Sequence, residues 1–215
     1  MTSNSSNKIG HVAIIMDGNS RWARQRNLKT IEGHKQGVNR LRDIVKYSAK
    51  SEITHLSVFA FSTENWKRSA SDVSDLMKLF LQSIIKEVPE LIENKVQLNF
   101  IGDIPRFSKS LVSQINSAMK DTQAKKPNLN LNVAISYGGR WDILNAIKRI
   151  KDHKINTDKL SEDDFSNLLS TSDFPDPDLL IRTGDEIRIS NFFLWQISYS
   201  ELYLSLIHIS EPTRH

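Results

Sequence analysis

The chain of 215 residues carries 29 lysines and arginines against 25 aspartates and glutamates, for a formal charge of +4, and it has no cysteine. Disulfides and thiolate metal sites are therefore excluded. The slight positive charge is compatible with phosphate groups, nucleic acid or a membrane surface as a partner. Residues 1–8 are polar and no run is apolar for long enough to span a bilayer, so we expect a cytoplasmic protein.

In chain order, short apolar runs alternate with segments of helical period, which is typical of βαβ units that build a parallel sheet. Amphipathic helices are indicated around residues 38–45, 115–119 and 143–150. We predict one α/β domain with a central, mostly parallel six-stranded sheet flanked by helices. The expected strands are His11–Met16, His55–Phe61, Val96–Ile101, Leu129–Ser136, Asp178–Ile181 and Phe192–Ile197.

The segment from Val73 to Ile92 has an apolar face that is wider than a surface helix needs. A helix buried in the core or at a dimer interface explains this pattern as well as a helix that contacts an apolar ligand. Pro89 is expected to bend or interrupt the helix.

Polar residues gather where the predicted strands end, which is where open parallel sheets bind ligands. Carboxylate, amide or hydroxyl side chains occur with at least one arginine after four of the strands, and this mixture suits a pyrophosphate with a divalent metal. Simpler explanations exist for the single residues: Asp17 could be a helix cap, His34 a surface histidine, and each arginine a solvated side chain. The four segments are Asp17–Trp22, Ser62–Arg68, Tyr137–Asp142 and Arg182–Asn191.

Five longer strings resemble the successive motifs of the cis-prenyltransferases of the undecaprenyl pyrophosphate synthase type. The resemblance runs in order from Lys8 to Tyr203, and several motifs in one order are far more specific than a single short pattern. It implies a homodimer with an apolar tunnel, which condenses isopentenyl pyrophosphate in cis onto an allylic pyrophosphate such as farnesyl pyrophosphate. The product would be a long polyprenyl pyrophosphate such as undecaprenyl pyrophosphate. The strings are HVAIIMDGNSRWA, EGHKQG, FAFSTENWKR, YGGRWDI and IRTGDEIRISNFFLWQISYSELY.

The resemblance also implies roles for single residues. Asp17 would bind Mg²⁺, with Glu201 as a second metal ligand, and Asp17 and Asn65 would be catalytic. The allylic pyrophosphate would be held by Gly18, Asn19, Arg21, Trp22 and His34. Substrate positioning would fall to Ser62, Trp66 and Arg68, together with Asn65. The isopentenyl pyrophosphate would be held by Arg182, Arg188 and Ser190.

Three features depart from the family pattern. Thr30 stands where an arginine is common, and Asp185 stands where a glycine is usual, which places a negative charge beside a phosphate site. Residues 204–215 do not continue the family pattern, so we expect the enzyme domain to cover residues 8–203 and the remainder to be a non-native tail.

Other functions fit the sequence less well. A non-catalytic partner subunit of a cis-prenyltransferase is the main alternative, although the catalytic motif residues argue against it. No G-x-G-x-x-G, G-K-[ST] or D-D-x-x-D motif occurs, and the arginines lie beside carboxylates and do not form a basic run, so a nucleic-acid partner is not expected. Peripheral membrane contact would serve product release.

Overall fold

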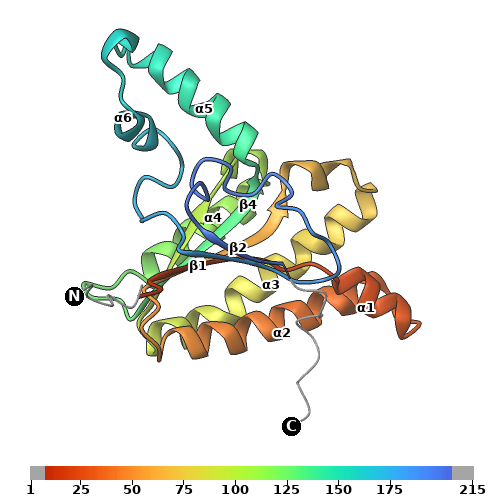
Figure 1. Ribbon diagram of the computed structural model, residues 1–215. Helices are drawn as coiled ribbons and strands as arrows, with labels where there is room; N and C mark the ends of the chain where they lie inside the picture. The colour runs from red at the N-terminus through yellow and green to blue at the C-terminus, as the bar shows by residue number, and fades with distance from the viewer. Residues whose placement is uncertain (1–7, 205–215) are drawn as a thin grey trace, which may run out of the picture.

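The computed structural model describes residues 8–204, and its centre is a six-stranded sheet with the order β3-β4-β2-β1-β5-β6 (Figure 1). All five neighbouring strand pairs are parallel. Five strands lie where the sequence predicts them, to within one or two residues. The strands are β1 His11–Ile15, β2 His55–Ser62, β3 Val96–Ile101, β4 Leu129–Tyr137, β5 Leu179–Arg182 and β6 Glu201–Leu204.

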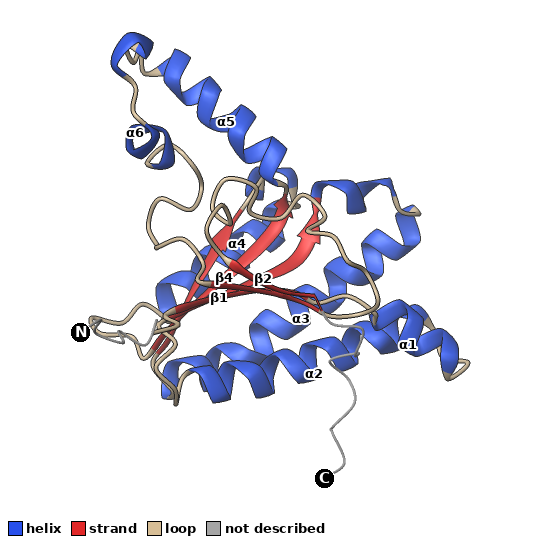
Figure 2. Cartoon of the chain, viewed as in Figure 1, coloured by secondary structure: helices blue, strands red, loops and turns tan. Residues whose placement is uncertain are grey.

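Three long helices, α2, α3 and α4, cover one face of the sheet, and their apolar residues join those of β1 to β4 in the larger core cluster (Figure 2). Helix α5 projects away from the sheet, with the short α6 beside it (Figure 1). The helices are α1 Asn19–Gln25, α2 Thr30–Ser48, α3 Ala70–Glu93, α4 Lys109–Asp121, α5 Gly139–Asp152 and α6 Glu162–Ser166. The 3-10 turns are η1 Thr63–Lys67, η2 Ile104–Arg106 and η3 Thr157–Lys159.

Helix α3 is continuous through Pro89, so the proline does not interrupt it, while the predicted alternative, a bend at Pro89, stays a prediction. It begins after Ser69, whose side chain accepts a hydrogen bond from the amide of Asp72. The proline removes a bond to the carbonyl of Ile85. Ile85 and Pro89 are both exposed, so water can satisfy that carbonyl where the helix passes it.

The sixth strand is a different segment from the predicted one. Phe192–Ile197 forms turns, and Glu201–Leu204 adds to β5 at the edge of the sheet. Phe193 has a φ of 47°, a left-handed conformation that no strand adopts. The apolar run is explained by burial: Phe192 and Phe193 are fully buried and stack on each other at 4.0 Å, in the core cluster on the second face of the sheet.

Leu204, which the sequence assigned to a tail, is the last residue of β6 and pairs with Arg182. The rest of the predicted tail, residues 205–215, lies outside the described residues. Within residues 8–204 no helix is both long enough and apolar enough to cross a membrane.

A buried polar network joins β1, β2 and β4. His11 is 1% exposed, and its Nε2 lies 2.7 Å from the Ser57 hydroxyl while its Nδ1 lies 2.6 Å from the Pro175 carbonyl. The amide of Asn132 donates to the same Ser57 oxygen. Burial lowers the pKa of His11 to about 4, although the Pro175 contact opposes this shift, so the ring is neutral at pH 7.

We expect this histidine to make folding sensitive to acid. The unfolded chain binds a proton at His11 near pH 6.5, but the folded chain does so only near pH 4, so the unfolded state binds more protons between these values. The free energy of unfolding should therefore fall by about 3 kcal/mol as the pH drops through this window. Urea titrations at several pH values measure this change. If the free energy of unfolding of His11→Gln depended on pH as strongly as that of the wild type, the prediction would be contradicted.

Candidate functional site

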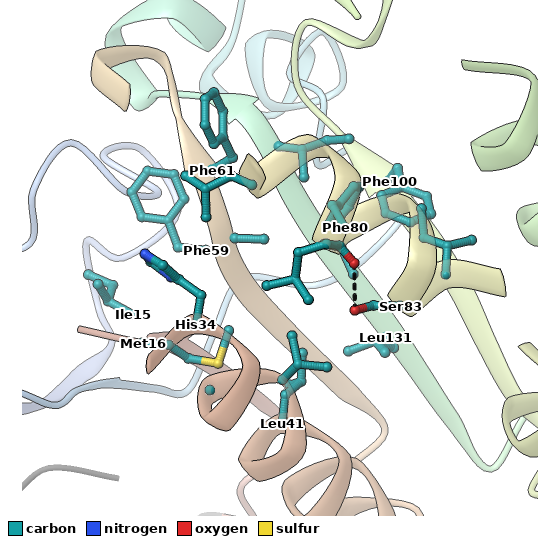
Figure 3. A pocket seen from close by; sticks show the side chains of 18 of the residues that line it. Ile15, Met16, His34, Leu41, Phe59, Phe61, Phe80, Ser83, Phe100 and Leu131 are labelled. Atoms are coloured by element: carbon teal, nitrogen blue, oxygen red, sulfur yellow. Dashed lines mark hydrogen bonds between the residues drawn. The ribbon is translucent and has the colours of Figure 1, made fainter. Parts of the chain in front are cut away.

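A cavity of about 780 Å³ lies between the sheet and helices α2 and α3. Its walls are mainly apolar, and Figure 3 shows Phe59, Leu41 and Phe80 around it with His34 among them. Ser83 is a polar residue in the α3 wall, but its hydroxyl donates to the Leu79 carbonyl within the helix, so it adds no free donor. The cavity can therefore hold a long apolar group.

One end of the cavity is polar and lies at the carboxyl ends of β1, β2 and β5. Strand β1 has β2 on one side and β5 on the other, so the strand order reverses at β1. Open α/β sheets bind ligands at such a topological switch point. This placement brings together three of the four polar segments that the sequence singled out. The polar residues at this end are Asp17, Asn19, His34, Ser62, Glu64, Asn65, Arg68, Arg182, Arg188, Ser190 and Asn191.

Asp17 and Arg182 form the centre of this polar end. Asp17 Oδ2 accepts a hydrogen bond of 2.8 Å from Arg182 Nη2, and Asp17 Oδ1 accepts one of 2.6 Å from the Gly18 amide. The Arg182 side chain is only 5% exposed, whereas Asp17 is 33% exposed. A buried guanidinium thus holds a carboxylate that an incoming ligand can reach.

The loop after β5 is held around the same arginine. Arg182 Nη1 donates to the Arg188 carbonyl and, at 2.6 Å, to the Ser190 hydroxyl. Arg182 Nε is buried and has no partner among the described residues, so it is a donor left for a ligand. Arg188 is largely exposed and pairs with Glu186 at 2.9 Å, so an anion that binds its guanidinium would compete with this carboxylate.

Three glycines determine the position of helix α1 against α2. Gly18 precedes α1 with a φ of 94°, which a residue with a side chain rarely adopts. A Cβ at Gly33 would lie 1.9 Å from the Asn19 carbonyl oxygen, and one at Gly37 would lie 2.7 Å from Asn19 Nδ2. The glycines of the EGHKQG motif therefore place Asn19 in the site by allowing the helices to touch.

His34 lies in the second turn of α2 and lines the cavity, and its Nε2 is buried without a hydrogen-bond partner. Burial, together with the charge of Arg68, lowers its pKa to about 4, although Asp72 opposes the shift. The ring is therefore neutral at pH 7, with one nitrogen available to bond a ligand in the cavity.

Ser62 and Asn65 are positioned by each other. The Asn65 amide donates to the Ser62 hydroxyl at 3.2 Å, and the Ser62 amide donates to Asn65 Oδ1 at 3.0 Å, so the two residues form a capping box that starts η1. Arg68 ends the same turn and lines the cavity. The turn thus presents three of the predicted residues on one rigid element.

Glu64 and Asn191 line the site although the sequence did not single them out. Asn191 Nδ2 donates to Glu64 Oε1 at 2.9 Å and ties the loop after β5 to η1. Burial favours the neutral form of Glu64, but hydrogen bonds from its own backbone, Asn191 and Thr63 outweigh this and lower its pKa. Both residues stand inside the predicted polar segments, but no pattern distinguishes them from their neighbours there.

Besides Gly18, which forms the turn before α1, four predicted residues do not line the cavity. Trp22 contacts the guanidinium of Arg26 at 4.5 Å, and Trp66 donates to the Ser136 hydroxyl at 2.9 Å and packs against Phe107. Arg21 is bound to Asp185 at 2.8 Å beside the cavity.

The fourth, Glu201, begins β6 and pairs with Leu179 at the start of β5. Asp17 follows β1, whose last residue pairs with Arg182 at the end of β5. Leu179 and Arg182 are three residues apart, which is roughly 10 Å along the strand. The structure does not bring Glu201 to Asp17.

The fourth polar segment, Tyr137–Asp142, also stays outside the cavity and is structural. The Tyr137 hydroxyl donates to Asp142 at 3.0 Å, and Asp142 also accepts from the Ser170 amide. Burial raises the pKa of Asp142, and burial with the adjacent Asp142 carboxyl raises that of Tyr137.

Among residues 8–204 there is no group of three or more acidic, histidine or cysteine side chains that could hold a metal ion. Asp17 is thus the available carboxylate next to Arg182. Magnesium commonly keeps several waters and takes only one or two carboxylates together with substrate phosphates, so the partly exposed Asp17 carboxylate beside Arg182 fits it.

Comparisons with known proteins identify the family of the chain. A family model described as putative undecaprenyl diphosphate synthase matches residues 15–211. A protein of Legionella pneumophila (strain Paris), named ditrans,polycis-undecaprenyl-diphosphate synthase ((2E,6E)-farnesyl-diphosphate specific), is 43% identical over 95% of this chain and 87% of its own length. An isoprenyl transferase of Neisseria meningitidis serogroup A is 47% identical over 91% of this chain and 77% of its own length.

Solved structures of similar fold are also prenyl diphosphate synthases. Lavandulyl diphosphate synthase from Lavandula x intermedia, in complex with dimethylallyl diphosphate, superposes with a TM-score of 0.89 at 34% identity, over 95% of this chain and 89% of that one. A probable undecaprenyl diphosphate synthase from Campylobacter jejuni gives 0.80 at 32% identity, over 96% and 90%. These relatives are named as synthases, which favours a catalytic chain over a non-catalytic partner. The chain belongs to the undecaprenyl diphosphate synthase family of cis-prenyl chain-elongating enzymes.

Proposed function

We propose that this chain condenses isopentenyl pyrophosphate onto an allylic pyrophosphate, with farnesyl pyrophosphate as the first primer, and repeats the step to make a long cis-polyprenyl pyrophosphate. The observation that carries this proposal is the cavity itself, whose polar end with its arginines continues into about 780 Å³ of mainly apolar space. A substrate with a pyrophosphate head and an apolar tail matches both ends.

Two groups of side chains would hold the two pyrophosphates. Arg182 Nε at the end of β5, and Arg188 and Ser190 on the loop after it, offer donors. Asn19, Arg68 and the neutral His34 face the cavity from α1, η1 and α2. Guanidinium groups bind pyrophosphate oxygens through paired, charge-assisted hydrogen bonds, so these positions fix both orientation and charge. The two substrates are thereby held close together.

In the reaction the allylic C–O bond breaks and pyrophosphate leaves with the electron pair. The terminal carbon of the isopentenyl double bond forms a new bond to the allylic carbon, and a proton is then lost to give the cis double bond. Arg68 and the α1 residues would stabilise the charge that develops on the leaving pyrophosphate. The apolar walls exclude water from the allylic cation that would otherwise be hydrolysed.

Mg²⁺ is the metal that fits the site, with Asp17 as its protein ligand. When bound, it would neutralise charge on the pyrophosphate oxygens and make the leaving group better. Asp17 would exchange part of its contact with Arg182 for this ion, while the Gly18 amide keeps the carboxylate in place.

The direct test is to incubate the chain with farnesyl pyrophosphate, labelled isopentenyl pyrophosphate and Mg²⁺, and to resolve the extracted products by length. We expect label in cis-polyprenyl products and none when the metal is chelated. A folded chain that incorporates no label under any of these conditions would overturn the proposal. Label without a metal requirement would overturn only the role of Mg²⁺.

Asp185 is expected to weaken pyrophosphate binding. Its carboxylate pairs with Arg21 at 2.8 Å and competes with a phosphate for that guanidinium, and both side chains are partly exposed. Because exposed ion pairs contribute at most about 1 kcal/mol, Asp185→Asn should lower the dissociation constant for inorganic pyrophosphate about threefold to fivefold. Isothermal titration calorimetry measures this. Unchanged or weaker binding would contradict the competition.

A homodimer is supported by apolar side chains that the single chain leaves exposed. Leu144 and Ile147 lie one turn apart on the projecting α5, and Leu202 and Tyr203 lie on the edge strand β6. Within residues 8–204 no strand pairs with the outer edge of β6, and proteins usually cover an edge strand that carries apolar side chains. Light scattering of the chain and of Leu144→Lys tests the dimer.

Product release should depend on an apolar acceptor. Each five-carbon unit that enters the cavity contributes about 4 kcal/mol of apolar burial, at about 0.8 kcal/mol per carbon. Long products should therefore leave slowly into water and faster into detergent or a membrane. We expect detergent to raise the steady-state rate but not the first turnover. Equal steady-state rates with and without detergent would contradict slow release.

A further inference from the structure

Asn191, in the loop after β5, is bound to two elements that lie far from it in the sequence. It follows Ser190 directly, and the two residues have positive φ angles of 63° and 47°. Phe193, two positions further on, also has a φ of 47°. Residues other than glycine adopt this left-handed conformation rarely, and a run of it persists only where the surrounding structure holds it. The contacts of Asn191 therefore fix where the loop, and Ser190 with it, lies.

The first contact of Asn191 is with the N-terminus of α5. This helix begins after Gly138, which has no side chain to cap it. The first backbone N–H groups of a helix have no partner within the helix. Asn191 supplies two partners, because its backbone oxygen accepts from the Gly139 amide at 2.7 Å and its Oδ1 accepts from the Arg140 amide at 2.9 Å. The polar segment Tyr137–Asp142, which does not line the cavity, thus holds one side of Asn191.

The second contact of Asn191 is with η1. Asn191 Nδ2 donates to Glu64 Oε1 at 2.9 Å, and the other carboxylate oxygen of Glu64 accepts from the Thr63 hydroxyl at 3.1 Å. A Cβ at Gly138 would lie 2.6 Å from Asn191 Nδ2 and 2.8 Å from the Thr63 hydroxyl oxygen, so this glycine allows the loop and η1 to approach each other. Burial opposes the charged form of Glu64, but hydrogen bonds lower its pKa, so the bond from Asn191 is charge-assisted at neutral pH.

The two segments that Asn191 joins carry different parts of the proposed site. Ser190 stands directly before it in the loop that would hold isopentenyl pyrophosphate. Asn65 and Arg68 follow Glu64 on η1, and they would position the substrates and hold the allylic pyrophosphate. A negative Glu64 in the cavity wall would repel a pyrophosphate, and its bond with Asn191 explains its place there. The distance between loop and turn also sets how the two reacting carbons meet.

We propose that Asn191 and Glu64 are positioning residues, and that the hydrogen bond between the Asn191 amide and the Glu64 carboxylate holds the isopentenyl pyrophosphate site at a fixed place relative to η1. This inference rests on the proposed function. Neither side chain needs to touch a substrate for this role. The role requires only that one of the two side chains donates and the other accepts, so it can be tested by exchanging donor and acceptor.

The sharpest test therefore reverses the direction of this bond. Asn191→Asp keeps an oxygen for the Arg140 amide but turns a second carboxylate toward Glu64, so the bond is lost and the two charges repel. Glu64→Gln keeps an oxygen for Asn191 Nδ2 and removes only the charge. In Asn191→Asp/Glu64→Gln the amide at position 64 can donate to the carboxylate at position 191, which restores the bond with donor and acceptor exchanged.

We expect Asn191→Asp to raise the KM for isopentenyl pyrophosphate about tenfold to a hundredfold, because the loop with Ser190 moves away from its working position. The KM for farnesyl pyrophosphate should not change, since α1 and α2 stay in place. Glu64→Gln alone should raise the KM for isopentenyl pyrophosphate about threefold at most, since a neutral hydrogen bond replaces a charge-assisted one. The double variant should regain most of the loss. A smaller folded fraction alone would lower the turnover number and leave both KM values unchanged.

The matched control is Asn156→Asp, at an exposed asparagine that does not line the cavity. Its Oδ1 likewise accepts a hydrogen bond from a backbone amide, that of Asp158 at 3.0 Å, so both KM values should stay at those of wild type. A severe loss in Glu64→Gln, with no recovery in the double variant, would overturn the positioning role and assign Glu64 a direct action on a substrate. Circular dichroism shows whether each variant is folded. If Asn191→Asp does not fold, Glu64→Ala removes the same acceptor at an exposed residue, and an unchanged KM for isopentenyl pyrophosphate in that variant would overturn the positioning role.

A binding measurement separates this inference from the proposed function. Isothermal titration calorimetry with isopentenyl pyrophosphate and Mg²⁺, without an allylic substrate, should show weaker binding to Asn191→Asp and recovered binding to the double variant. Equal affinity of wild type and Asn191→Asp would overturn the positioning role and leave the proposed function intact. A folded wild type that binds no isopentenyl pyrophosphate would instead overturn the proposed function.

Discussion

Replacing Asp17 with asparagine is expected to lower the turnover number by roughly two to three orders of magnitude, the range seen when one group that stabilises transition-state charge is removed. The amide keeps the size of the side chain, but its one oxygen can accept only the bond from the Gly18 amide or the bond from Arg182, which use different oxygens of Asp17. It carries no charge, so it is a much weaker ligand for Mg²⁺. A steady-state assay over a range of Mg²⁺ concentrations should show a lower maximum rate and a higher metal requirement.

The matched control is Asp185, whose carboxylate lies beside the cavity and pairs with Arg21. Asp185→Asn makes the same chemical change near the arginines, but it should strengthen pyrophosphate binding because it releases Arg21. Opposite effects of the two substitutions would show that position, and not net charge, determines activity. Circular dichroism and thermal unfolding confirm that both variants are folded. An Asp17→Asn enzyme within threefold of wild type would contradict the assigned role.

Much of the fold could be predicted because parallel strands buried on both faces are continuous apolar runs. Such a run does not distinguish a strand from any other buried segment. Phe192–Ile197 is also an apolar run and is partly buried, but its phenylalanines pack on Phe59 and Tyr137 from a loop. The true edge strand, Glu201–Leu204, is half exposed and carries a weaker apolar pattern.

The candidate site was predictable where it follows from topology alone. Residues after β1, β2 and β5 meet because the carboxyl ends of neighbouring parallel strands share one edge. Which side chains then enter the cavity depends on loop paths and register, which involve contacts between distant parts of the sequence. Glu64 meets Asn191 across 127 positions, and Trp66 turns toward Phe107, and neither contact has a local signal.

The EGHKQG motif places a glycine inside a helix, where helix propensity alone predicts another residue. Glycine weakens a helix interior by about 1 kcal/mol relative to alanine, so propensity alone favours alanine at position 33. The structure explains the glycine by contact, because a Cβ there would lie 1.9 Å from the carbonyl oxygen of Asn19. A backbone atom cannot rotate away, so helix α1 and the residues it carries would have to move.

Gly33→Ala is therefore expected to lower the free energy of unfolding by about 1–3 kcal/mol, since overpacking outweighs the gain in helix propensity. Its effect on activity should be larger, up to roughly a hundredfold, because displacement of α1 moves Asn19 and the Gly18 turn by a distance that disrupts alignment. Urea unfolding and steady-state kinetics measure the two effects separately.

The control for this prediction is Gly10→Ala, at a position where a Cβ would meet only side-chain oxygens at 3.7 Å. The same chemical change there should leave activity within about twofold and stability within about 0.5 kcal/mol, as for substitutions away from sensitive features. If Gly33→Ala behaved like Gly10→Ala, the contact between α1 and α2 would not position the site. A Cβ at Gly33 and a Cβ at Gly37 would both meet Asn19. The effects of Gly33→Ala and Gly37→Ala should therefore be less than additive, because the displacement of α1 by the first substitution already relieves the clash of the second.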